Sequence, residues 1–295
     1  MTGYTTAALE QAFPRFAAFR PIGRGGEGAV FSVWDRARKE DVALKVMPDG
    51  GDPELYERFE REYSILATSR SNNLVIVYNH GRGPIHTSDG SAQSHFWYTM
   101  ERCESTVRLT YRSMRLGLRI SLVMQMLDGL AFLHAKNVAH RDIKPENLFL
   151  VRGTQLKIGD FGLATLSRAQ SAPGAAGMVS GSPPYLAPER WSGAGDQDAD
   201  WRPSDQYAAG VTAFELFTCG GAALDFTAGY MRAHTSGPVN RLVLGELRSR
   251  PLFSVDQVLR RMLAKRPEDR YPDIAECKRE LDAALAQDGV TGMGY

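Results

Sequence analysis

A short stretch near the middle of the chain carries polar residues of the types that bind metal ions and phosphate groups. Carboxylate and amide oxygens are the ligands that Mg²⁺, a hard cation, takes in proteins, often together with phosphate oxygens. A lysine beside them suits the negative charge of phosphate. The stretch therefore indicates chemistry on a phosphate compound that carries Mg²⁺. The residues of interest in it are His140, Arg141, Asp142, Lys144, Asn147 and Asp160.

The spacing of these residues predicts how they come together. Two short strand-like runs, 147–151 and 155–158, are separated by residues 152–154, Arg-Gly-Thr, which are typical of a hairpin turn. A hairpin returns the chain to the end from which it started. Asp142, just before the first run, and Asp160, just after the second, are therefore expected at the same end of the hairpin.

The composition is that of an ordinary globular protein. A chain of 295 residues can bury a large core, as one bilobal unit or as two domains. The formal net charge of +1 shows no bias toward nucleic acid or an acidic membrane. Cys103, Cys219 and Cys277 are widely spaced, which predicts reduced thiols in the cytoplasm rather than disulfides. We find neither a signal-peptide pattern nor an apolar run that approaches the roughly 18–20 residues of a membrane span.

A glycine-rich segment precedes two predicted strands. Residues 23–30 read GRGGEGAV, the pattern GxGxxGxV, and glycines let a backbone turn approach a phosphate with its N–H groups exposed. By itself this pattern fits a plain glycine-rich hairpin at least as well. Its position before strands rather than before a helix argues against a dinucleotide-binding Rossmann unit.

A lysine and a glutamate are expected to pair. Lys45 lies within an alternating strand over 42–47, where a lysine is usually a solvated edge residue. The helix predicted to begin after Asp52 places Glu62 within its apolar stripe. An unpaired carboxylate that faces the core is costly, so Glu62 should have a cationic partner, and Lys45 is the natural candidate. The alternative is that Glu62 lies at the edge of the stripe, in water.

Helical patterns frame the polar stretch. Apolar residues recur with a period near 3.6 from about Leu116 to His134, which predicts a core helix that leads into it. Ser204 and Asp205 are predicted to cap a buried helix over 206–218. Two further amphipathic helices are predicted at about 254–263 and 271–285.

These motifs, in this order, resemble the eukaryotic-type, or Hanks-type, protein kinase family. HRDxKxxN at 140–147 is followed by DFG at 160–162. The VALK run at 42–45 is similar to the VAIK motif of the family. The resemblance covers about residues 19–285, and the sequence is most similar in character to bacterial members of the family.

Motifs in the second half of the chain also resemble those of the family. Residues 181–189, GSPPYLAPE, are similar to the family's GTxxYxAPE, with Ser182 in place of threonine. Asp205 matches the family aspartate that supports the backbone of the catalytic loop. Arg270 matches the arginine that pairs with Glu189.

The resemblance implies an α+β, bilobal protein-kinase fold. A small antiparallel β lobe with one key helix would cover about 19–100, a hinge 101–104, and a larger, mainly helical lobe about 105–285. Residues 1–18 would be a flanking segment, either a helix or a mobile leader, and residues 286–295 a C-terminal tail. ATP would lie in the cleft under the glycine-rich segment.

The resemblance also implies a role for each catalytic residue. Asp142 would orient the attacking hydroxyl group and accept its proton. Lys144 would balance the charge of the γ-phosphate. Lys45, held by Glu62, would position the α- and β-phosphates.

The same resemblance implies the cofactors and their ligands. Asn147 and Asp160 would hold Mg²⁺, for which Mn²⁺ could substitute. Met100 would be the gatekeeper beside the adenine pocket, and the backbone of Glu101 and Cys103 would bind adenine. The residues implied to bind ATP are Ile22, Gly23, Gly25, Gly28, Val30, Ala43, Lys45, Met100, Glu101, Cys103 and Phe149.

The implied activity is transfer of the γ-phosphate of MgATP to protein hydroxyl groups. Lys144, two positions after the catalytic aspartate, and Ser182 fit the serine/threonine pattern. The implied partners are protein substrates and a second copy of the chain for autophosphorylation in trans, with no nucleic acid and no membrane span. Two alternatives stay open. A pseudokinase usually lacks at least one catalytic residue, and a small-molecule phosphotransferase would not be expected to carry the 182–189 segment with Arg270.

Residues 163–180 are small and polar, which predicts a mobile segment. Arg141 is the arginine that in many relatives pairs with a phosphorylated residue of this segment. Ser180 is the leading candidate for that residue, although a loop serine is normally only solvated. The other hydroxyl candidates are Thr165, Ser167 and Ser171.

Overall fold

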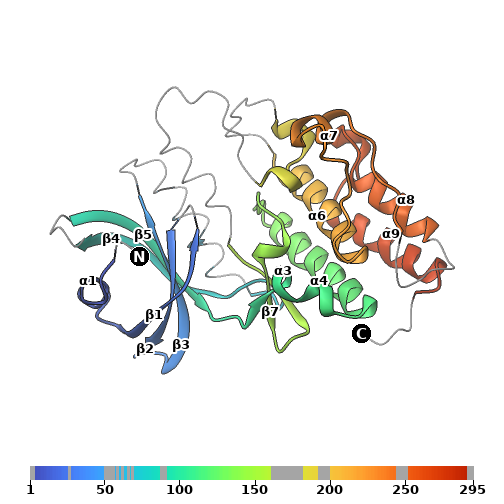
Figure 1. Cartoon of the computed structure of the whole chain (residues 1–295). Helices are drawn as coiled ribbons and strands as arrows, with labels where there is room; N and C mark the ends of the chain where they lie inside the picture. The colour runs from blue at the N-terminus through green and yellow to red at the C-terminus, as the bar shows by residue number, and fades with distance from the viewer. Residues whose placement is uncertain are drawn as a thin grey trace. The chain divides into compact units, whose positions relative to one another are not determined.

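The computed structural model divides the chain into two compact units, which are described separately (Figure 1). Unit 1 comprises residues 1–70, 75–103 and 163–173, and unit 2 comprises residues 71–74, 104–162 and 174–295. The chain leaves unit 1 after Cys103, inside the range where we expected a hinge. The residues that the structure describes are 4–25, 28–49, 57, 60, 63–64, 67, 70–86, 92–160, 182–191, 200–243 and 252–290.

Unit 1 is built on a five-stranded antiparallel sheet in the order β1-β2-β3-β5-β4, which confirms the predicted β lobe. Side chains alternate along β3. Val42, Leu44 and Val46 join the hydrophobic core on one face, and Lys45 points to the other. The strands are β1 (Phe16–Gly25), β2 (Gly28–Asp35), β3 (Glu40–Pro48), β4 (Val77–His86) and β5 (Ala92–Glu101).

A short N-terminal helix, α1 (Thr6–Ala12), packs against the same core. The Thr5 side chain caps it by accepting the N–H of Ala8 at 3.2 Å. Leu9 is only 1% exposed, and the Phe13 ring meets the Trp97 ring edge-on, with centroids 5.5 Å apart. Of the two alternatives for this segment, the structure therefore shows the helix.

The substitution Leu9→Ala is expected to lower the free energy of unfolding by about 2–4 kcal/mol, because it removes buried methyl groups and leaves a cavity. Urea denaturation followed by circular dichroism measures the change. The matched control is Glu10→Ala on the exposed side of α1, which should change stability by less than about 0.5 kcal/mol. Equal stability of Leu9→Ala and the wild type would mean that α1 does not belong to this core in solution.

Unit 2 contains the predicted hairpin. β7 (Leu148–Val151) and β8 (Gln155–Ile158) pair antiparallel. Arg152 and Gly153 have φ values of +53° and +70°, which let the chain reverse within three residues. A third strand, β6 (Ser105–Thr106), pairs with β7.

Helices form most of the rest of the described part of unit 2 (Figure 1). The prediction that Ser204 and Asp205 cap the helix over 206–218 is wrong, because this helix, α6, already begins at Arg202 with Pro203 in its first turn, where a missing N–H costs nothing. The helices are α3 (Val107–Thr110), α4 (Leu116–His134), α6 (Arg202–Phe217), α7 (Tyr230–Ser236), α8 (Phe253–Met262) and α9 (Ile274–Gln287). The 3₁₀ turns are η1 (Tyr111–Ser113), η2 (Pro145–Asn147), η3 (Pro183–Tyr185), η4 (Pro188–Arg190) and η5 (Pro267–Asp269).

By length and composition, α4 is the one helix among the described residues that could cross a membrane, with a mean hydropathy of 1.5 over its most apolar window. The sequence analysis found no apolar run that approaches a membrane span and predicted a core helix over these residues. In the structure 56% of that window is buried, and α4 packs against α6, α9 and β8. The core helix of a globular domain passes the same test, so the packing favours a core role.

Candidate active site

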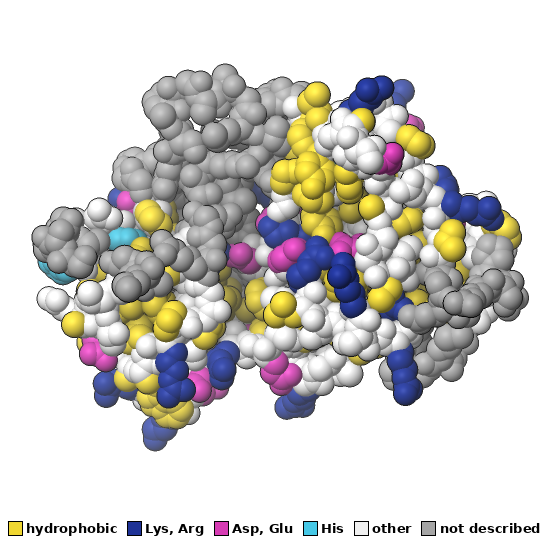
Figure 2. All heavy atoms as spheres, in the orientation of Figure 1, with side chains coloured by type: hydrophobic (Ala, Val, Ile, Leu, Met, Phe, Trp, Pro, Cys, Tyr) yellow, Lys and Arg dark blue, Asp and Glu magenta, His cyan; other side chains and the backbone are white. Residues whose placement is uncertain are grey.

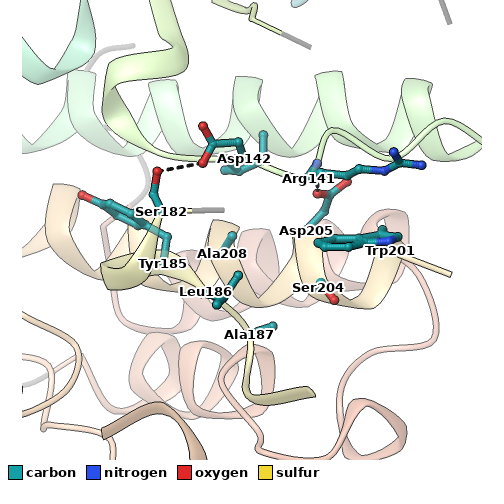
Figure 3. A pocket seen from close by; sticks show the side chains of 11 residues that line it. Arg141, Asp142, Ser182, Tyr185, Leu186, Ala187, Trp201, Ser204, Asp205 and Ala208 are labelled. Atoms are coloured by element: carbon teal, nitrogen blue, oxygen red, sulfur yellow. Dashed lines mark hydrogen bonds between the residues drawn. The ribbon is translucent and has the colours of Figure 1, made fainter. Parts of the chain in front are cut away.

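Asp142 lies at the centre of a hydrogen-bond cluster in unit 2. Lys144 Nζ donates to Asp142 Oδ2 and to Ser182 Oγ, each at 2.6 Å. Ser182 Oγ donates to Asp142 Oδ1 at 2.8 Å (Figure 3). Asn147 Nδ2 donates to Asp142 Oδ2 at 2.9 Å and to its backbone carbonyl at 2.8 Å. The structure thus brings together three residues of the predicted motif, and adds a serine from a distant segment.

The backbone before Asp142 is fixed by Asp205. This carboxylate is 1% exposed and accepts the backbone N–H groups of His140 and Arg141, each at 2.7 Å. It also accepts His134 Nε2–H at 2.9 Å. Arg141 has a φ of +73°, a strained value for a non-glycine residue that persists only where the surroundings impose it. Asp205 supplies that constraint from α6.

The ring of His140 ties this loop to the end of the hairpin. Its Nδ1 accepts the N–H of Asp142 at 3.3 Å, so Nε2 carries the proton and donates to the Gly159 carbonyl at 3.0 Å. Gly159 N–H in turn donates to the Asn147 carbonyl at 3.0 Å. Because Gly159 immediately precedes Asp160, the predicted convergence of the two hairpin ends is confirmed.

Asn147 and Asp160 provide a donor set that fits Mg²⁺. The amide nitrogen of Asn147 is engaged with Asp142, which leaves its oxygen as the metal-binding atom, and Asp160 supplies a carboxylate. No group of three or more His, Cys, Asp or Glu side chains that could hold a metal occurs among the described residues. A cation here would need oxygens of phosphate or water to complete its shell, which is how Mg²⁺ usually binds with nucleotides.

Lys45, in unit 1, is buried at 5% exposure rather than solvated. In the ladder it lies opposite Val30 of β2 and Tyr98 of β5. The centroids of the Tyr63 and Tyr98 rings are 4.5 Å apart. Because Tyr98 lies directly opposite Lys45 in the ladder, Tyr63 lies on the same face of the sheet as Lys45. Glu62, the predicted partner of Lys45, lies outside the described residues, and the pair stays a prediction.

The glycine-rich segment forms the adjoining ends of β1 and β2. Gly23 pairs with Val30, and Gly25 pairs with Gly28. Gly28 is sterically required, because a Cβ there would lie 2.2 Å from the Val46 carbonyl oxygen. A Cβ at Gly23 would meet Val30 Cβ at 3.7 Å, an ordinary contact. Residues 26–27 lie outside the described part of the chain.

The other residues predicted to bind ATP are placed in both units. Ala43 and Met100 are buried and lie opposite each other in β3 and β5. Glu101 N–H donates to the Ile76 carbonyl at 2.9 Å, and Glu101 Oε1 accepts Ile76 N–H at 2.7 Å, which fixes the start of the predicted hinge. Within unit 1, Ile22 is 51% exposed and Cys103 is partly buried, and within unit 2 Phe149 is partly buried in β7.

The predicted pair of Glu189 and Arg270 is present. Arg270 Nη2 donates to Glu189 Oε2 at 2.7 Å, and Arg270 Nη1 donates to Glu189 Oε1 at 2.8 Å. Burial raises the pKa of Glu189, but the hydrogen bonds and charge of Arg270 outweigh it and hold that pKa below its ordinary value. The candidate phosphorylation sites Thr165, Ser167, Ser171 and Ser180 lie outside the described residues, as do Phe161 and Gly162 of the DFG motif.

A small cavity beside Asp142 contains residues that the sequence analysis did not predict (Figure 3). The largest of these unpredicted side chains is Trp201. The guanidinium carbons of Arg190 and Arg141 lie 4.0 and 5.7 Å from the centroid of its ring. Nothing in the local sequence of Trp201 signals this position. The cavity is lined by Arg141, Asp142, Ile143, Ser182, Tyr185, Leu186, Ala187, Trp201, Ser204, Asp205 and Ala208.

Comparisons with known proteins agree with this geometry. The chain is 32% identical over 293 residues to the serine/threonine-protein kinase Pkn1 of Myxococcus xanthus, and the match covers 92% of this chain and 38% of Pkn1. It is 31% identical over 280 residues to the serine/threonine-protein kinase PknL of Mycobacterium tuberculosis, covering 91% of this chain and 65% of PknL. The chain thus spans less than two thirds of these relatives. The family profile described as "Protein kinase domain" matches residues 16–278. The chain therefore belongs to the protein kinase family, with bacterial serine/threonine kinases among its relatives.

Proposed function

We propose that this protein is a serine/threonine protein kinase that transfers the γ-phosphate of MgATP to protein hydroxyl groups and also phosphorylates itself. The observation that carries the proposal is the hydrogen-bond cluster of Asp142, Lys144, Asn147 and Ser182. It places a carboxylate, a cation and an amide together on a loop that Asp205 holds rigidly.

The proposed reaction uses these side chains as positioning and charge-balancing groups. The acceptor hydroxyl takes the place of Ser182 as donor to Asp142, and its proton passes to that carboxylate as the oxygen–phosphorus bond forms. The bond between the γ-phosphorus and the bridging oxygen breaks, and ADP leaves. Lys144 offsets the charge of the transferred group, and Lys45 positions the other phosphates. Asn147 and Asp160 would hold Mg²⁺, which would neutralise phosphate charge when bound.

Two features support a protein as the acceptor. Ser182 and Glu189 belong to one segment beside Asp142, which Arg270 anchors by its ion pair with Glu189, and a polypeptide can dock on a segment of this kind. On the face drawn in Figure 2, basic and acidic side chains are interspersed, a pattern that offers no extended track for a nucleic-acid backbone. A small-molecule phosphotransferase would have no use for this segment, and a pseudokinase would not need all of the catalytic side chains.

We further propose that the protein acts in the cytoplasm and associates with a second copy during autophosphorylation. All three cysteines are free thiols, as expected in a reducing compartment.

The direct test is incubation of the purified protein with γ-labelled ATP, Mg²⁺ and a general acceptor protein, followed by peptide mapping. Label on serine or threonine, dependent on Mg²⁺, is expected. Binding of ATP without label on the protein or the acceptor would contradict the proposal and favour a pseudokinase. Label on a small alcohol or amine alone would favour a small-molecule phosphotransferase.

A further inference from the structure

A second cavity in unit 2 lies among the ends of three helices, the C-terminal end of α4 and the N-terminal ends of α6 and α9. α4 packs against both of the other helices (Figure 1). The volume of the cavity is about 340 Å³, within the range of about 300–1,000 Å³ that is usual for small-molecule sites. The cavity beside Asp142, by contrast, has about 20 Å³, which is room for roughly one water molecule. We call the larger one the α4–α6–α9 cavity.

The more buried part of this lining is mainly apolar. Ala131 comes from α4, Pro203 from α6, and Tyr271 and Ile274 from the start of α9 and the residues before it. Gln206 is also buried there, but both ends of its amide are bonded to the backbone of Tyr271. Its Nε2 donates to the Tyr271 carbonyl at 2.9 Å, and its Oε1 accepts the Tyr271 N–H at 3.0 Å. The cavity therefore offers chiefly contact surface, which suits a flat and largely apolar molecule.

One polar atom of the lining, Nδ1 of His134, has no hydrogen-bond partner among the described residues, and it is not fully buried. The His134 side chain is only 10% exposed, and its Nε2 donates to Asp205 Oδ2 at 2.9 Å. Because Nε2 carries the proton in that bond, Nδ1 of the neutral ring is an acceptor. A molecule in the cavity that carries an N–H or O–H group can satisfy it.

The charged side chains of the lining disfavour an anion. Arg202 donates to both carboxylate oxygens of Asp200, through Nε and Nη2, each at 2.9 Å. The hydrogen bonds of Arg202 hold the pKa of Asp200 below its ordinary value, so this carboxylate is charged at neutral pH. Asp273 adds a second carboxylate, which accepts the Glu276 N–H at 2.7 Å. With two carboxylates and one guanidinium in the lining, a neutral molecule is favoured over an anion.

The cavity is connected to the catalytic loop through hydrogen bonds. Asp205, which His134 contacts, also accepts the two backbone N–H groups that precede Asp142. In addition, Arg202 Nη1 donates to Asn137 Oδ1 at 3.2 Å, in the turn that follows α4 and leads to the loop. A donor on Nδ1 polarises the His134 ring and makes Nε2–H a stronger donor to Asp205. Occupation of the cavity should thus strengthen the support of the loop.

We propose that the α4–α6–α9 cavity is a regulatory site for a small, flat, neutral heteroaromatic molecule, which donates an N–H or O–H group to His134 and thereby speeds phosphate transfer. The flat body of the molecule lies against the apolar lining. The effect on phosphate transfer rests on the proposed kinase function, whereas binding in the cavity does not.

The binding test uses indole, a flat bicyclic molecule with one N–H group, and 1-methylindole, which has no donor. Both are titrated at pH 8, where a histidine is normally neutral, with saturating MgADP to fill the nucleotide site. The signals are those of ¹³C-labelled alanine methyl groups, because Ala131, Ala135 and Ala275 line the cavity. Indole should shift these signals with a Kd of about 0.1–1 mM. 1-Methylindole should bind about tenfold more weakly, because it leaves Nδ1 unsatisfied.

The variant Ala131→Phe fills the cavity, and Ala283→Phe, on the exposed surface of α9 and outside the lining, is the matched control. The affinity for indole should fall at least about tenfold in Ala131→Phe and stay unchanged in the control. At saturating MgATP and acceptor protein, indole should speed phosphate transfer about two- to fivefold in the wild type and the control, but not in Ala131→Phe. Should Ala131→Phe fail to fold, Ala135→Trp, at the exposed end of α4, obstructs the same cavity and must give the same result.

Three results would overturn the inference. Indole that shifts none of the three methyl signals at concentrations up to about 10 mM would show that the cavity is not a site for this class of molecule. Equal affinity for 1-methylindole would remove the role of His134. Unchanged phosphate transfer with the cavity occupied would remove the regulation. A wild type that transfers no phosphate would instead overturn the proposed function and the rate effect with it, while the methyl signals would still decide whether the cavity binds indole.

Discussion

Phosphate transfer by the Asp142→Asn variant is expected to be slower than that of the wild type by a factor of about 10²–10⁴, the usual contribution of a positioned proton acceptor. The carboxylate now accepts from Lys144, Asn147 and Ser182 at 2.6–2.9 Å. An asparagine keeps the shape, but it has one acceptor oxygen fewer and cannot take the proton of the attacking hydroxyl group. Its amide hydrogens would also face the donors that now surround Asp142.

Binding of MgATP should survive this substitution. Asp142 is not among the residues predicted to hold Mg²⁺ or the nucleotide, so the dissociation constant for MgATP, measured by fluorescence or calorimetry, should change by no more than a few fold. Asp128→Asn is the matched control, because Asp128 is a half-exposed carboxylate of unit 2 that pairs with Lys278 at 2.6 Å, away from the site. Near-wild-type turnover of Asp142→Asn would show that another group accepts the proton.

The parts of this site that the sequence could predict are the local ones. Asp142, Lys144 and Asn147 lie within six positions, and the hairpin that brings Asp160 back is closed by a three-residue turn. Contacts of this kind depend on the residues of turns and on the alternation of side chains along strands, and both can be recognised in short windows of sequence. The alternation of β3 also placed Lys45 on the face opposite the Val42, Leu44 and Val46 core.

The parts that could not be predicted depend on contacts between distant positions. The hydrogen bonds of Arg108 to Glu146, Tyr185 and Glu215, for example, join distant positions of the chain, and no periodicity connects them. Docking of α1 on the sheet likewise needs the shape of a surface that exists only after folding. The start of α6 was misplaced because a serine followed by an aspartate looks like a cap. In the structure the Asp205 side chain does not cap the helix but accepts N–H groups of the catalytic loop, the role that the family resemblance implied.

Because Asp205 is a buried hydrogen-bond acceptor, its removal is expected to destabilise the fold strongly. The substitution Asp205→Ala is expected to lower the free energy of unfolding by about 3–5 kcal/mol, because three donors would lose a buried acceptor that is only 1% exposed. The donors are the backbone N–H groups of His140 and Arg141 and the ring N–H of His134. Phosphate transfer should fall at least as strongly as in Asp142→Asn, since the strained backbone at Arg141 would lose the bond that maintains it.

Chemical denaturation measures the loss of stability. Phosphate transfer is measured separately, under conditions in which the variant is still folded. Asp282→Ala, on the exposed surface of α9, is the control and should change stability by less than about 0.5 kcal/mol. Asp205→Asn separates the two roles: it fills the space and retains one acceptor oxygen, so it should recover part of the stability while the catalytic loop still lacks one of its two N–H acceptors. Full activity in Asp205→Asn would mean that the loop holds its conformation without the carboxylate, and that its rigidity comes instead from the His140 ring and the β7–β8 hairpin.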